Sequence, residues 1–461
     1  MSTLEETSSR NLSFWHSTAS QPAQSPLAGD IDVDVAIVGG GFTGLWTAYY
    51  LKSLDPSLSV AIAEARFPGF GASGRNGGWV VGEMAGMATY LEDLATRESG
   101  IRLQRALFQA VDEIGRVTRE EGIDCHYTKG GTLNLATTPA YESHLRAEIK
   151  DWESLGFGQD DFRWLDRDEV AQRVRGPKAS GALFNPHCAV VHPFRLVSGL
   201  VDVLTQRGVQ IFSGTPATRI EGDKVLTPSG CIRAPMIVRA TEAYTDSLPG
   251  HRREMLPYYS MMIATEPLSE ETWGEIGLEA RETFADPRRM VIYGQRTADD
   301  RIAFGARGGY LFGSRIRNSF SPDEKVFHET RQTLTELFPI LKGVHVTHSW
   351  GGALGIPRDW SPSVGIDRRA GKAWAGGYVG EGVAASNLAG QTLADLILER
   401  ASSRIDLPWV GSPSPKWEPE PLRWLGIAIM NRLGDRLDRQ ELAGGSASRL
   451  FGSVYDWIVK K

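Results

Sequence analysis

A glycine-rich bend between a short apolar segment and a helical pattern constrains this chain more than any other feature of its sequence. Residues 33–38 form a β-rich run that ends at Gly39, and a helical pattern continues from Gly41 to Leu54. Residues 60–63 then have the composition of a second buried strand. The order strand, glycine bend, helix, strand predicts one βαβ unit with two parallel strands.

The bend has the G-x-G-x-x-G pattern of a dinucleotide site. The first glycine permits the tight turn, the second lets the backbone approach a diphosphate, and the third allows the helix to pack closely on the strand. Glu64, at the end of the second strand, is placed to accept hydrogen bonds from a ribose. The contacts predicted from this unit are Gly39, Gly41, Phe42, Thr43, Gly44 and Glu64. The same unit binds FAD in some proteins and NAD in others.

Two further segments favour FAD. Residues 69–78 form a loop of small residues and hydrogen-bond donors, long enough to follow an extended cofactor. Residues 373–383 have the pattern of a strand, a tight glycine loop and the start of a helix, and a second helix N-terminus suits the polar edge of a flavin ring. An NAD-dependent enzyme has no need of that second site, although it remains an alternative here.

These segments resemble the D-amino-acid-oxidase-like superfamily of FAD enzymes, the group of glycine oxidase, sarcosine oxidase and γ-glutamylputrescine oxidase. The likeness extends from Asp34 to about Leu398, and residues 71–78 match the Gly-Ala-Ser-Gly-Arg-Asn-Gly-Gly signature of the γ-glutamylputrescine-oxidase-like branch. Residues 417–422 are similar to those of aminophosphonate oxidoreductases. The resemblance implies an α/β plus α+β fold: a Rossmann-type FAD-binding domain with a second, antiparallel-sheet substrate domain, as in glycine and sarcosine oxidases.

The expected domains are discontinuous. Residues 1–30 form an N-terminal extension, with order beginning near Ile31. Residues 31–100, 186–250 and 345–400 form the FAD-binding domain, and residues 101–185 and 251–344 form the substrate-binding domain with a helical insert. Residues 401–461 form a tail with an amphipathic helix that we expect to pack on the protein through one apolar face. That face carries Leu422, Leu425, Ile429, Leu433 and Leu437.

The resemblance also implies a cofactor role for individual residues. Glu64 would bind the adenosine ribose, Arg66 would lie at the adenine end, and Ala217 would contact adenine through its backbone. The further contacts implied are Ala65, Arg66, Ala72, Ser73, Arg75, Asn76, Gly77, Gly78, Ala217, Ala240, Thr241, Gly352, Gly377, Tyr378, Val379, Gly380, Gly382 and Val383. Some relatives attach their flavin through a cysteine in the C-terminal third. This chain has no cysteine after Cys231, which favours non-covalent FAD.

The implied reaction removes a hydride from a carbon next to an amine nitrogen, and water then hydrolyses the imine. Arg307 is predicted to bind an anionic end of the substrate, and Tyr259 and Met262 to wall the pocket, so that Tyr259 and Arg307 are the candidate catalytic residues. The structural alternatives are a salt bridge for Arg307 and a core position for Tyr259. His192 precedes Pro193 at the start of a predicted helix, where a capping or packing role is favoured over that of a base.

Oxygen is the expected electron acceptor. Some relatives carry a lysine that helps oxygen react, at the position where this chain has Ala303. A dehydrogenase that passes electrons to another acceptor therefore remains open, as does a flavin-binding subunit without its own activity.

Composition excludes several other classes of function. The 50 basic and 56 acidic side chains give a net charge of −6 without a basic cluster, which disfavours nucleic acid as a partner. The three cysteines are far apart, and His345 and His348 lack carboxylate partners, so no metal site is expected. No apolar run approaches the ~20 residues of a membrane span. The first thirty residues do not have the pattern of a secretory signal, and a cytoplasmic location is expected.

Overall fold

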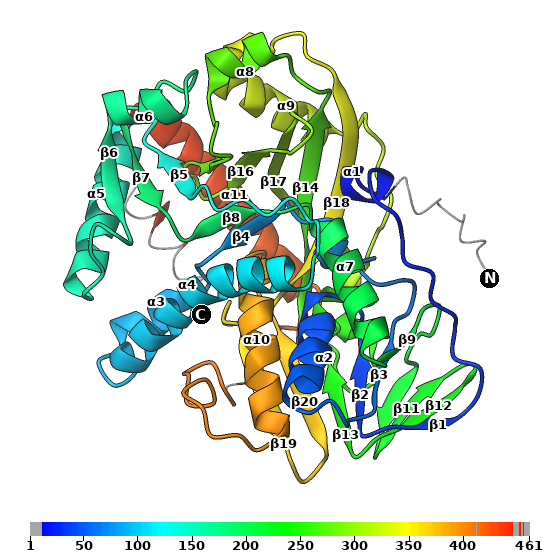
Figure 1. Ribbon diagram of the computed structural model, residues 1–461. Helices are drawn as coiled ribbons and strands as arrows, with labels where there is room; N and C mark the ends of the chain where they lie inside the picture. The colour runs from blue at the N-terminus through cyan, green and yellow to red at the C-terminus, as the bar shows by residue number, and fades with distance from the viewer. Residues whose placement is uncertain (1–11, 412, 446–450, 453–454, 456–461) are drawn as a thin grey trace.

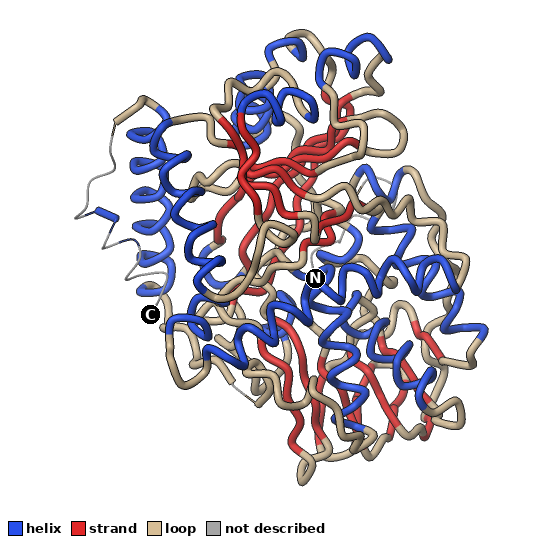
Figure 2. The backbone as a smooth tube through the Cα atoms, turned by 60° about the vertical axis from the view of Figure 1, so that its left-hand side comes forward, coloured by secondary structure: helices blue, strands red, loops and turns tan. Residues whose placement is uncertain are grey.

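The computed structural model of the chain describes residues 12–411, 413–445, 451–452 and 455. Its longer strands form two sheets, one above the other in Figure 1, and the turned view of Figure 2 shows the same two groups of strands. We call them the lower sheet and the upper sheet. The fold is the expected combination of an α/β unit and an α+β unit.

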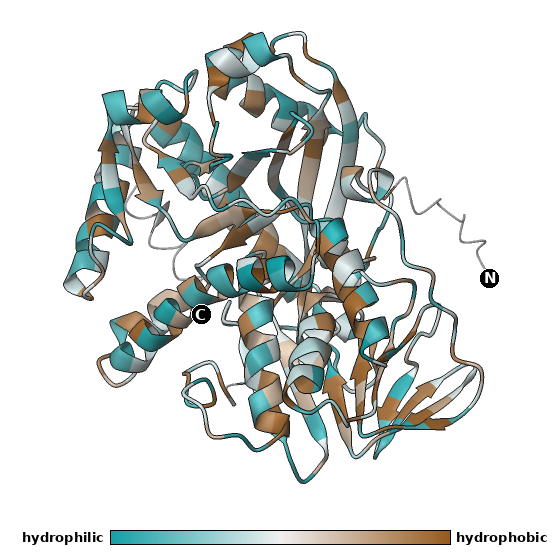
Figure 3. Ribbon diagram, viewed as in Figure 1, coloured by the Kyte–Doolittle hydropathy of each residue, from teal (hydrophilic) through white to brown (hydrophobic). Residues whose placement is uncertain are grey.

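The lower sheet contains the predicted βαβ unit. Its strands, in spatial order, are β19 (Ser363–Asp367), β20 (Lys372–Gly376), β13 (Met236–Arg239), β2 (Val35–Val38), β3 (Val60–Ala63) and β9 (Gln210–Phe212). All pairs are parallel except β19 with β20. Strands β2 and β3 are buried along their whole length, which accounts for their unbroken apolar sequence (Figure 3).

Helices cover the lower sheet. Helix α2 (Phe42–Leu54) lies beside α10 (Gly382–Ile397) in Figure 1, and α7 (Pro193–Gln206) packs against α2. Short strands flank this unit: β1 (Ile31–Asp32), β10 (Arg219–Glu221), β11 (Lys224–Thr227) and β12 (Gly230–Arg233) form one small sheet, and β4 (Trp79–Val81) pairs with β8 (Cys188–Val190). None of the helices in the described part of the chain combines the length and the apolarity that crossing a bilayer requires.

The upper sheet is mostly antiparallel. Its strands, in spatial order, are β18 (Val346–Ile356), β14 (Leu256–Thr265), β17 (Ile302–Tyr310), β16 (Ile292–Arg296), β15 (Thr283–Ala285), β5 (Thr132–Leu135), β7 (Gly181–Asn185) and β6 (Arg163–Asp166). Helix α9 (Lys325–Leu337) packs on β14 and β17, and α8 (Glu270–Ile276) joins the same hydrophobic core. Helices α5 (Pro139–Ser154) and α6 (Arg167–Arg173) lie at the far edge, where α5 is mostly hydrophilic (Figure 3).

The structure corrects the predicted domain of two elements. Helix α4 (Arg97–Glu120), at the start of the range 101–185, packs on α10 and places Leu103, Leu107 and Val111 in the core of the lower unit. Strand β18, in the range 345–400, pairs along its length with β14 in the upper sheet. Tertiary pairing decides both cases, while the remaining domain boundaries stay predictions.

Order begins earlier than the sequence predicted. Helix α1 (Phe14–Ser17) lies outside the expected ordered region, yet Phe14 and Trp15 are each 1 % exposed. The expectation that order begins near Ile31 is therefore wrong. The serine- and proline-rich composition of residues 17–26 masked the short aromatic segment before them.

The C-terminal helix packs through a different face from the one predicted. In α11 (Leu422–Leu442), Leu422, Leu425 and Ile429 are 61, 45 and 48 % exposed. The buried face carries Arg423, Ile427, Met430, Gly434, Leu437, Asp438 and Glu441. Buried ion pairs orient the helix, because Arg289 contacts Asp438 at 3.2 Å and Glu441 at 2.7 Å.

Candidate cofactor and substrate site

The glycine bend leaves no room for side chains. Gly39 has φ +112°, and a Cβ atom there would lie 2.3 Å from the carbonyl oxygen of Ala240. A Cβ on Gly44 would lie 2.1 Å from the carbonyl oxygen of Gly39. Helix α2 begins at Phe42 with no side-chain cap from Gly41, so the positive end of its dipole faces this bend. The local geometry is that of a diphosphate-binding turn.

Glu64 lies beside the bend, as the sequence predicted. Its carboxylate accepts hydrogen bonds from the N–H groups of Gly40 at 2.8 Å and Arg66 at 2.9 Å. Burial raises the pKa of Glu64, while these backbone donors act in the opposite direction. A carboxylate fixed in this way can accept hydrogen bonds from two neighbouring hydroxyl groups.

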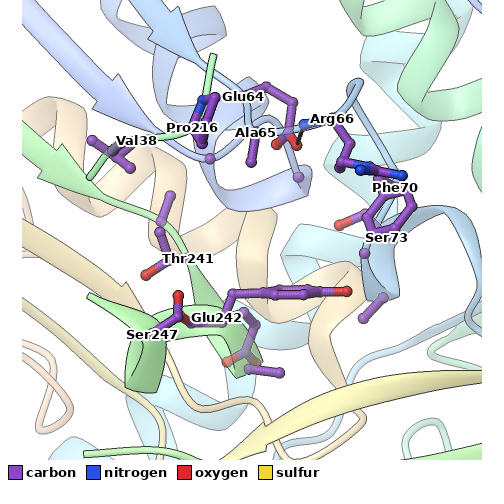
Figure 4. A pocket seen from close by; sticks show the side chains of 18 of the residues that line it. Val38, Glu64, Ala65, Arg66, Phe70, Ser73, Pro216, Thr241, Glu242 and Ser247 are labelled. Carbon is purple, nitrogen blue, oxygen red and sulfur yellow. Dashed lines mark hydrogen bonds between the residues drawn. The ribbon is translucent and has the colours of Figure 1, made fainter. Parts of the chain in front are cut away.

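Two cavities begin at the bend. The first extends between Glu64, Arg66 and Ser73 on one side and Thr241, Glu242 and Ser247 on the other (Figure 4). The second leads to Leu354 and the loop before α10. Both cavities are lined by Gly41, Ala72, Ser73, Ala240 and Glu242, so they form one elongated channel. An extended dinucleotide has this shape.

Most predicted cofactor residues line this channel. They are Gly39, Gly41, Phe42, Thr43, Glu64, Ala65, Arg66, Ala72, Ser73, Asn76, Ala217, Ala240, Thr241, Tyr378, Gly380, Gly382 and Val383. Phe70, Glu242, Tyr244 and Leu354 also line it, and sequence reasoning missed them. Glu242 follows Thr241 directly and Tyr244 lies three residues after it, so their place in the chain was a usable signal.

The other predicted cofactor residues do not line the channel. They are Gly44, Arg75, Gly77, Gly78, Gly352, Gly377 and Val379. Two of them, Arg75 and Gly77, contact segments beside the channel. Arg75 is 2 % exposed, and its guanidinium donates to the carbonyl oxygens of Phe70 at 2.8 Å and Gly351 at 3.3 Å. A Cβ on Gly77 would lie 2.5 Å from the Tyr293 ring, which ties this loop to the upper sheet.

The two faces of the upper sheet have different neighbours. On one face, a Cβ at Gly305 would lie 2.4 Å from both Met262 and Tyr293, the residue that also meets Gly77. On the other face, a Cβ at Gly308 would lie 3.0 Å from the Cβ of Tyr259. The first face, which includes Met262, therefore lies toward the loop of residues 69–78, and the second face packs on α9.

The structure places Tyr259 away from the channel, which contradicts its predicted role. Tyr259 is 4 % exposed in the core beneath α9, with its ring 5.7 Å from that of Phe320 and its hydroxyl accepting from the Arg317 N–H. The register of β14 and β17 shifts between Tyr259 and Ser260, where Ser260 pairs with Arg307. Side chains alternate along a strand, so Ser260 and Met262, and not Tyr259, share the cofactor-facing side.

Arg307 lies on the cofactor-facing side without a salt bridge. Within the described residues its guanidinium has no hydrogen bond or ion pair, and it lies 5.8 Å from the centre of the Trp360 ring. The carboxylate of Glu381 lies nearby. Burial and the neighbouring Glu83 raise the pKa of Glu381 to about 7, while the charge of Arg307 acts in the opposite direction. The structural alternative for Arg307 is therefore not observed.

Other predictions concern single residues. His192 caps α7, because its Nδ1 accepts a hydrogen bond from the Arg195 N–H at 3.1 Å, which confirms the capping role. Cys125, Cys188 and Cys231 are buried, and none of them lines the channel. Among the described residues, no group of histidine, cysteine and carboxylate side chains is arranged to hold a metal.

Comparison with known proteins identifies the family. The model described as FAD dependent oxidoreductase (DAO) matches residues 34–396. The chain belongs to this family. γ-Glutamylputrescine oxidoreductase of Escherichia coli (strain K12) is 30 % identical over 422 residues, covering 88 % of this chain and 94 % of the relative. The β subunit of sarcosine oxidase from an Arthrobacter species is 25 % identical over 347 residues, covering 72 % of this chain and 78 % of the relative.

Solved structures share the fold. Glycine oxidase from Geobacillus kaustophilus superposes with a TM-score of 0.67 at 21 % identity, covering 80 % of this chain and 96 % of that one. L-Proline dehydrogenase from P. horikoshii gives 0.65 at 19 % identity, covering 83 % and 96 %. The chain is an FAD-dependent oxidoreductase, and the channel from Glu64 to Leu354 has the lining that FAD requires.

Helix α1 contacts the loop of residues 69–78, which carries several of the predicted FAD contacts. The Trp15 indole N–H donates to the carbonyl oxygen of Asn76 at 2.8 Å, and the Ser13 hydroxyl donates to that of Gly74 at 3.2 Å. His16 packs against Gly74, where a Cβ atom would lie 2.9 Å from its ring. Residues far apart in the sequence are thus joined at the channel wall.

The variant Trp15→Phe tests this contact. It keeps the ring but removes the N–H donor, so we expect the free energy of unfolding to fall by about 1 kcal/mol and FAD to bind more weakly. Chemical unfolding and FAD titration measure the two effects. Trp409→Phe is the matched control, because Trp409 is 0 % exposed and its indole N–H has no partner among the described residues. Equal effects of the two substitutions would show that the hydrogen bond contributes nothing.

Proposed function

We propose that this protein oxidises an amine at the carbon next to nitrogen, and that its substrate carries an anionic group at the other end. FAD, when bound, supplies the hydride acceptor. Water then hydrolyses the imine to a carbonyl compound and a free amine or ammonia. The relatives that act on γ-glutamylputrescine and sarcosine support the amine class.

The observation that carries the proposal is the unpaired guanidinium of Arg307 on the cofactor-facing side of the upper sheet. Arg307 is partly buried, and a cation that is removed from water without a partner is destabilising unless a ligand supplies the anion. Arginine binds a carboxylate or a phosphonate through two parallel hydrogen bonds. Aminophosphonates, γ-glutamylated polyamines and N-methylated amino acids all combine an amine with such an anion.

The carboxylate of Glu381 suits the amine end of the substrate. Hydride transfer needs the neutral amine, so the substrate ammonium must lose a proton. Glu381 stands between Gly380 and Gly382, which line the channel, and its pKa is raised to about 7 by burial and by Glu83. A carboxylate with that pKa can accept the proton near neutral pH. Arg307 would hold the anionic end, and Glu381 would face the ammonium.

A dehydrogenase is the second candidate, favoured by one observation. Ala303 is 0 % exposed and brings no charge to the face of β17 where some relatives carry a lysine. We propose oxygen as the acceptor, with hydrogen peroxide as product. Slow reoxidation in air would instead favour another electron acceptor. A cytoplasmic location also stays a prediction.

Anaerobic bleaching of the flavin tests the proposal. The FAD-loaded protein is mixed with amines of equal length that end in a phosphonate, a carboxylate or a methyl group. We expect the anionic amines to bleach the flavin and the methyl-ended amine to do so at least tenfold more slowly. Admitting air then separates an oxidase from a dehydrogenase.

Two outcomes would contradict the proposal. If no amine of any class bleaches the flavin while dithionite does, the protein is a flavin-binding subunit without its own amine chemistry. If the methyl-ended amine reacts as fast as the anionic ones, the anion site at Arg307 is wrong.

A further inference from the structure

Glu242 is the most unusual residue of the FAD channel. It begins the short helix η3 (Glu242–Ser247), directly after the predicted contacts Ala240 and Thr241, and it lines both cavities. Its φ of +44° lies in the left-handed region, which is unfavourable for a residue with a side chain. Strain of this kind is retained where the surrounding contacts require it.

The Glu242 carboxylate connects three segments of the channel. One oxygen accepts a hydrogen bond from the Gly377 N–H at 3.1 Å and the other from the Tyr378 N–H at 3.1 Å. The Tyr378 hydroxyl shares a hydrogen bond of 2.9 Å with Thr43 in the first turn of α2. Glu242 therefore fixes the loop at the flavin end to the helix that faces the diphosphate. The side chain fits tightly, since a Cβ on Gly355 would lie 2.1 Å from a carboxylate oxygen.

The Glu242 carboxylate forms no salt bridge within the described residues. Arg239, on β13, is the charged group that acts on it, but the Arg239 guanidinium contacts Glu254 at 3.1 Å. Tyr378 faces it from the loop, and Gly355 of β18 adds no charge. Across the first cavity lie Glu64, which is also a carboxylate, and Arg66, which is exposed. Burial raises the pKa of Glu242 to about 7, against the two backbone donors and Arg239.

We propose that Glu242 is a positioning residue for FAD and that it takes up one proton from solvent when the FAD diphosphate enters the channel. The diphosphate belongs at Gly41, which lines the same junction of the two cavities as Glu242. Two new negative charges at that junction disfavour an ionised carboxylate that has no salt-bridge partner. The neutral acid still accepts one hydrogen bond from the loop and gains an O–H donor.

Proton linkage gives the test. FAD is titrated into the full-length protein freed of cofactor, by calorimetry at about pH 8 in two buffers of different ionisation enthalpy. We expect the wild type to take up close to one proton for each FAD bound. Its Kd should rise by up to about tenfold for each pH unit above about 7. Glu242→Gln keeps the size of the side chain and cannot titrate, so its Kd should change little with pH and no proton should be taken up.

Two further variants separate the causes. Glu64→Gln removes the other carboxylate of the channel, and we expect it to weaken FAD binding while proton uptake continues. Glu242→Asp keeps the titrating group but shortens it, so uptake should continue while Kd rises, which tests positioning even if Glu242→Gln does not fold.

The outcomes are distinct. Proton uptake that persists in Glu242→Gln, or that disappears in Glu64→Gln, would overturn the inference, as would a wild type that binds FAD without any uptake. Failure to bind FAD at any pH would instead overturn the assignment of the channel itself.

Discussion

Replacing Gly39 with alanine is expected to yield protein with little bound FAD. The backbone at Gly39 has φ +112°, and the new Cβ would lie 2.3 Å from the Ala240 carbonyl oxygen. The left-handed backbone costs about 1–3 kcal/mol, and the forced contact costs about 1–3 kcal/mol more. Relief requires β13 to move away from the bend, which opens the diphosphate site. The ratio of flavin absorbance to protein in the purified variant measures the loss.

Gly29 supplies the matched control for this substitution. It has a similar φ of +120°, but nothing lies within 4 Å of the Cβ position. Gly29→Ala therefore carries only the backbone strain, and we expect it to keep a full complement of FAD. Gly41→Ala is a second test with less risk to folding, since its Cβ would meet only the Ser73 hydroxyl at 2.9 Å. Full FAD content in Gly39→Ala would show that the bend does not hold the cofactor.

Replacing Arg307 with glutamine is expected to lower kcat/KM for an anionic amine by about 10- to 100-fold, the range of a charge-assisted hydrogen bond. The loss should be selective. The methyl-ended amine lacks the anion, so its kcat/KM should change less than about threefold. Steady-state kinetics with both amines measures the difference, and Arg307→Lys should recover part of the activity because it keeps the charge without the bidentate geometry.

Arg315→Gln is the control for a change of surface charge. Arg315 is exposed, lies near Arg307 in the sequence, and has no ion pair among the described residues. It should leave both substrates unaffected. An equal loss for anionic and neutral amines in Arg307→Gln would mean that Arg307 supports the fold and does not bind the substrate.

The sequence determined the parts of the protein that depend on local geometry. The glycine spacing and the two apolar runs specify the turn, helix α2 and strands β2 and β3, because each step involves residues close in the chain. Glu64 follows at a fixed distance along the same unit, so its place beside Gly40 could be predicted as well. The second glycine loop before α10 is local in the same sense.

Tertiary structure decided which side chains face the channel elsewhere. Strand alternation puts Tyr259 on the side of β14 that packs on α9, and the register shift leaves Gly308 of β17 without a partner on β14. Neither the shift nor the partner strand is encoded nearby in the sequence. Arg307 and Ser260 share the other face because β17 pairs with β14.

Contacts between residues far apart in the sequence also explain the placement of α1, α11 and Glu242. Trp15 packs against Trp350 and donates its N–H to the carbonyl of Asn76, and α11 leaves Leu422, Leu425 and Ile429 exposed while Arg289 binds Asp438 and Glu441. Glu242 gains its role only when Gly377 and Tyr378 are brought to its carboxylate. Local periodicity specifies which segments form helices and strands, while long-range polar contacts determine which surfaces those segments bury. The sequence thus determined the cofactor and its turn, and the tertiary structure determined which face of the upper sheet lies toward residues 69–78 and which contacts support the channel.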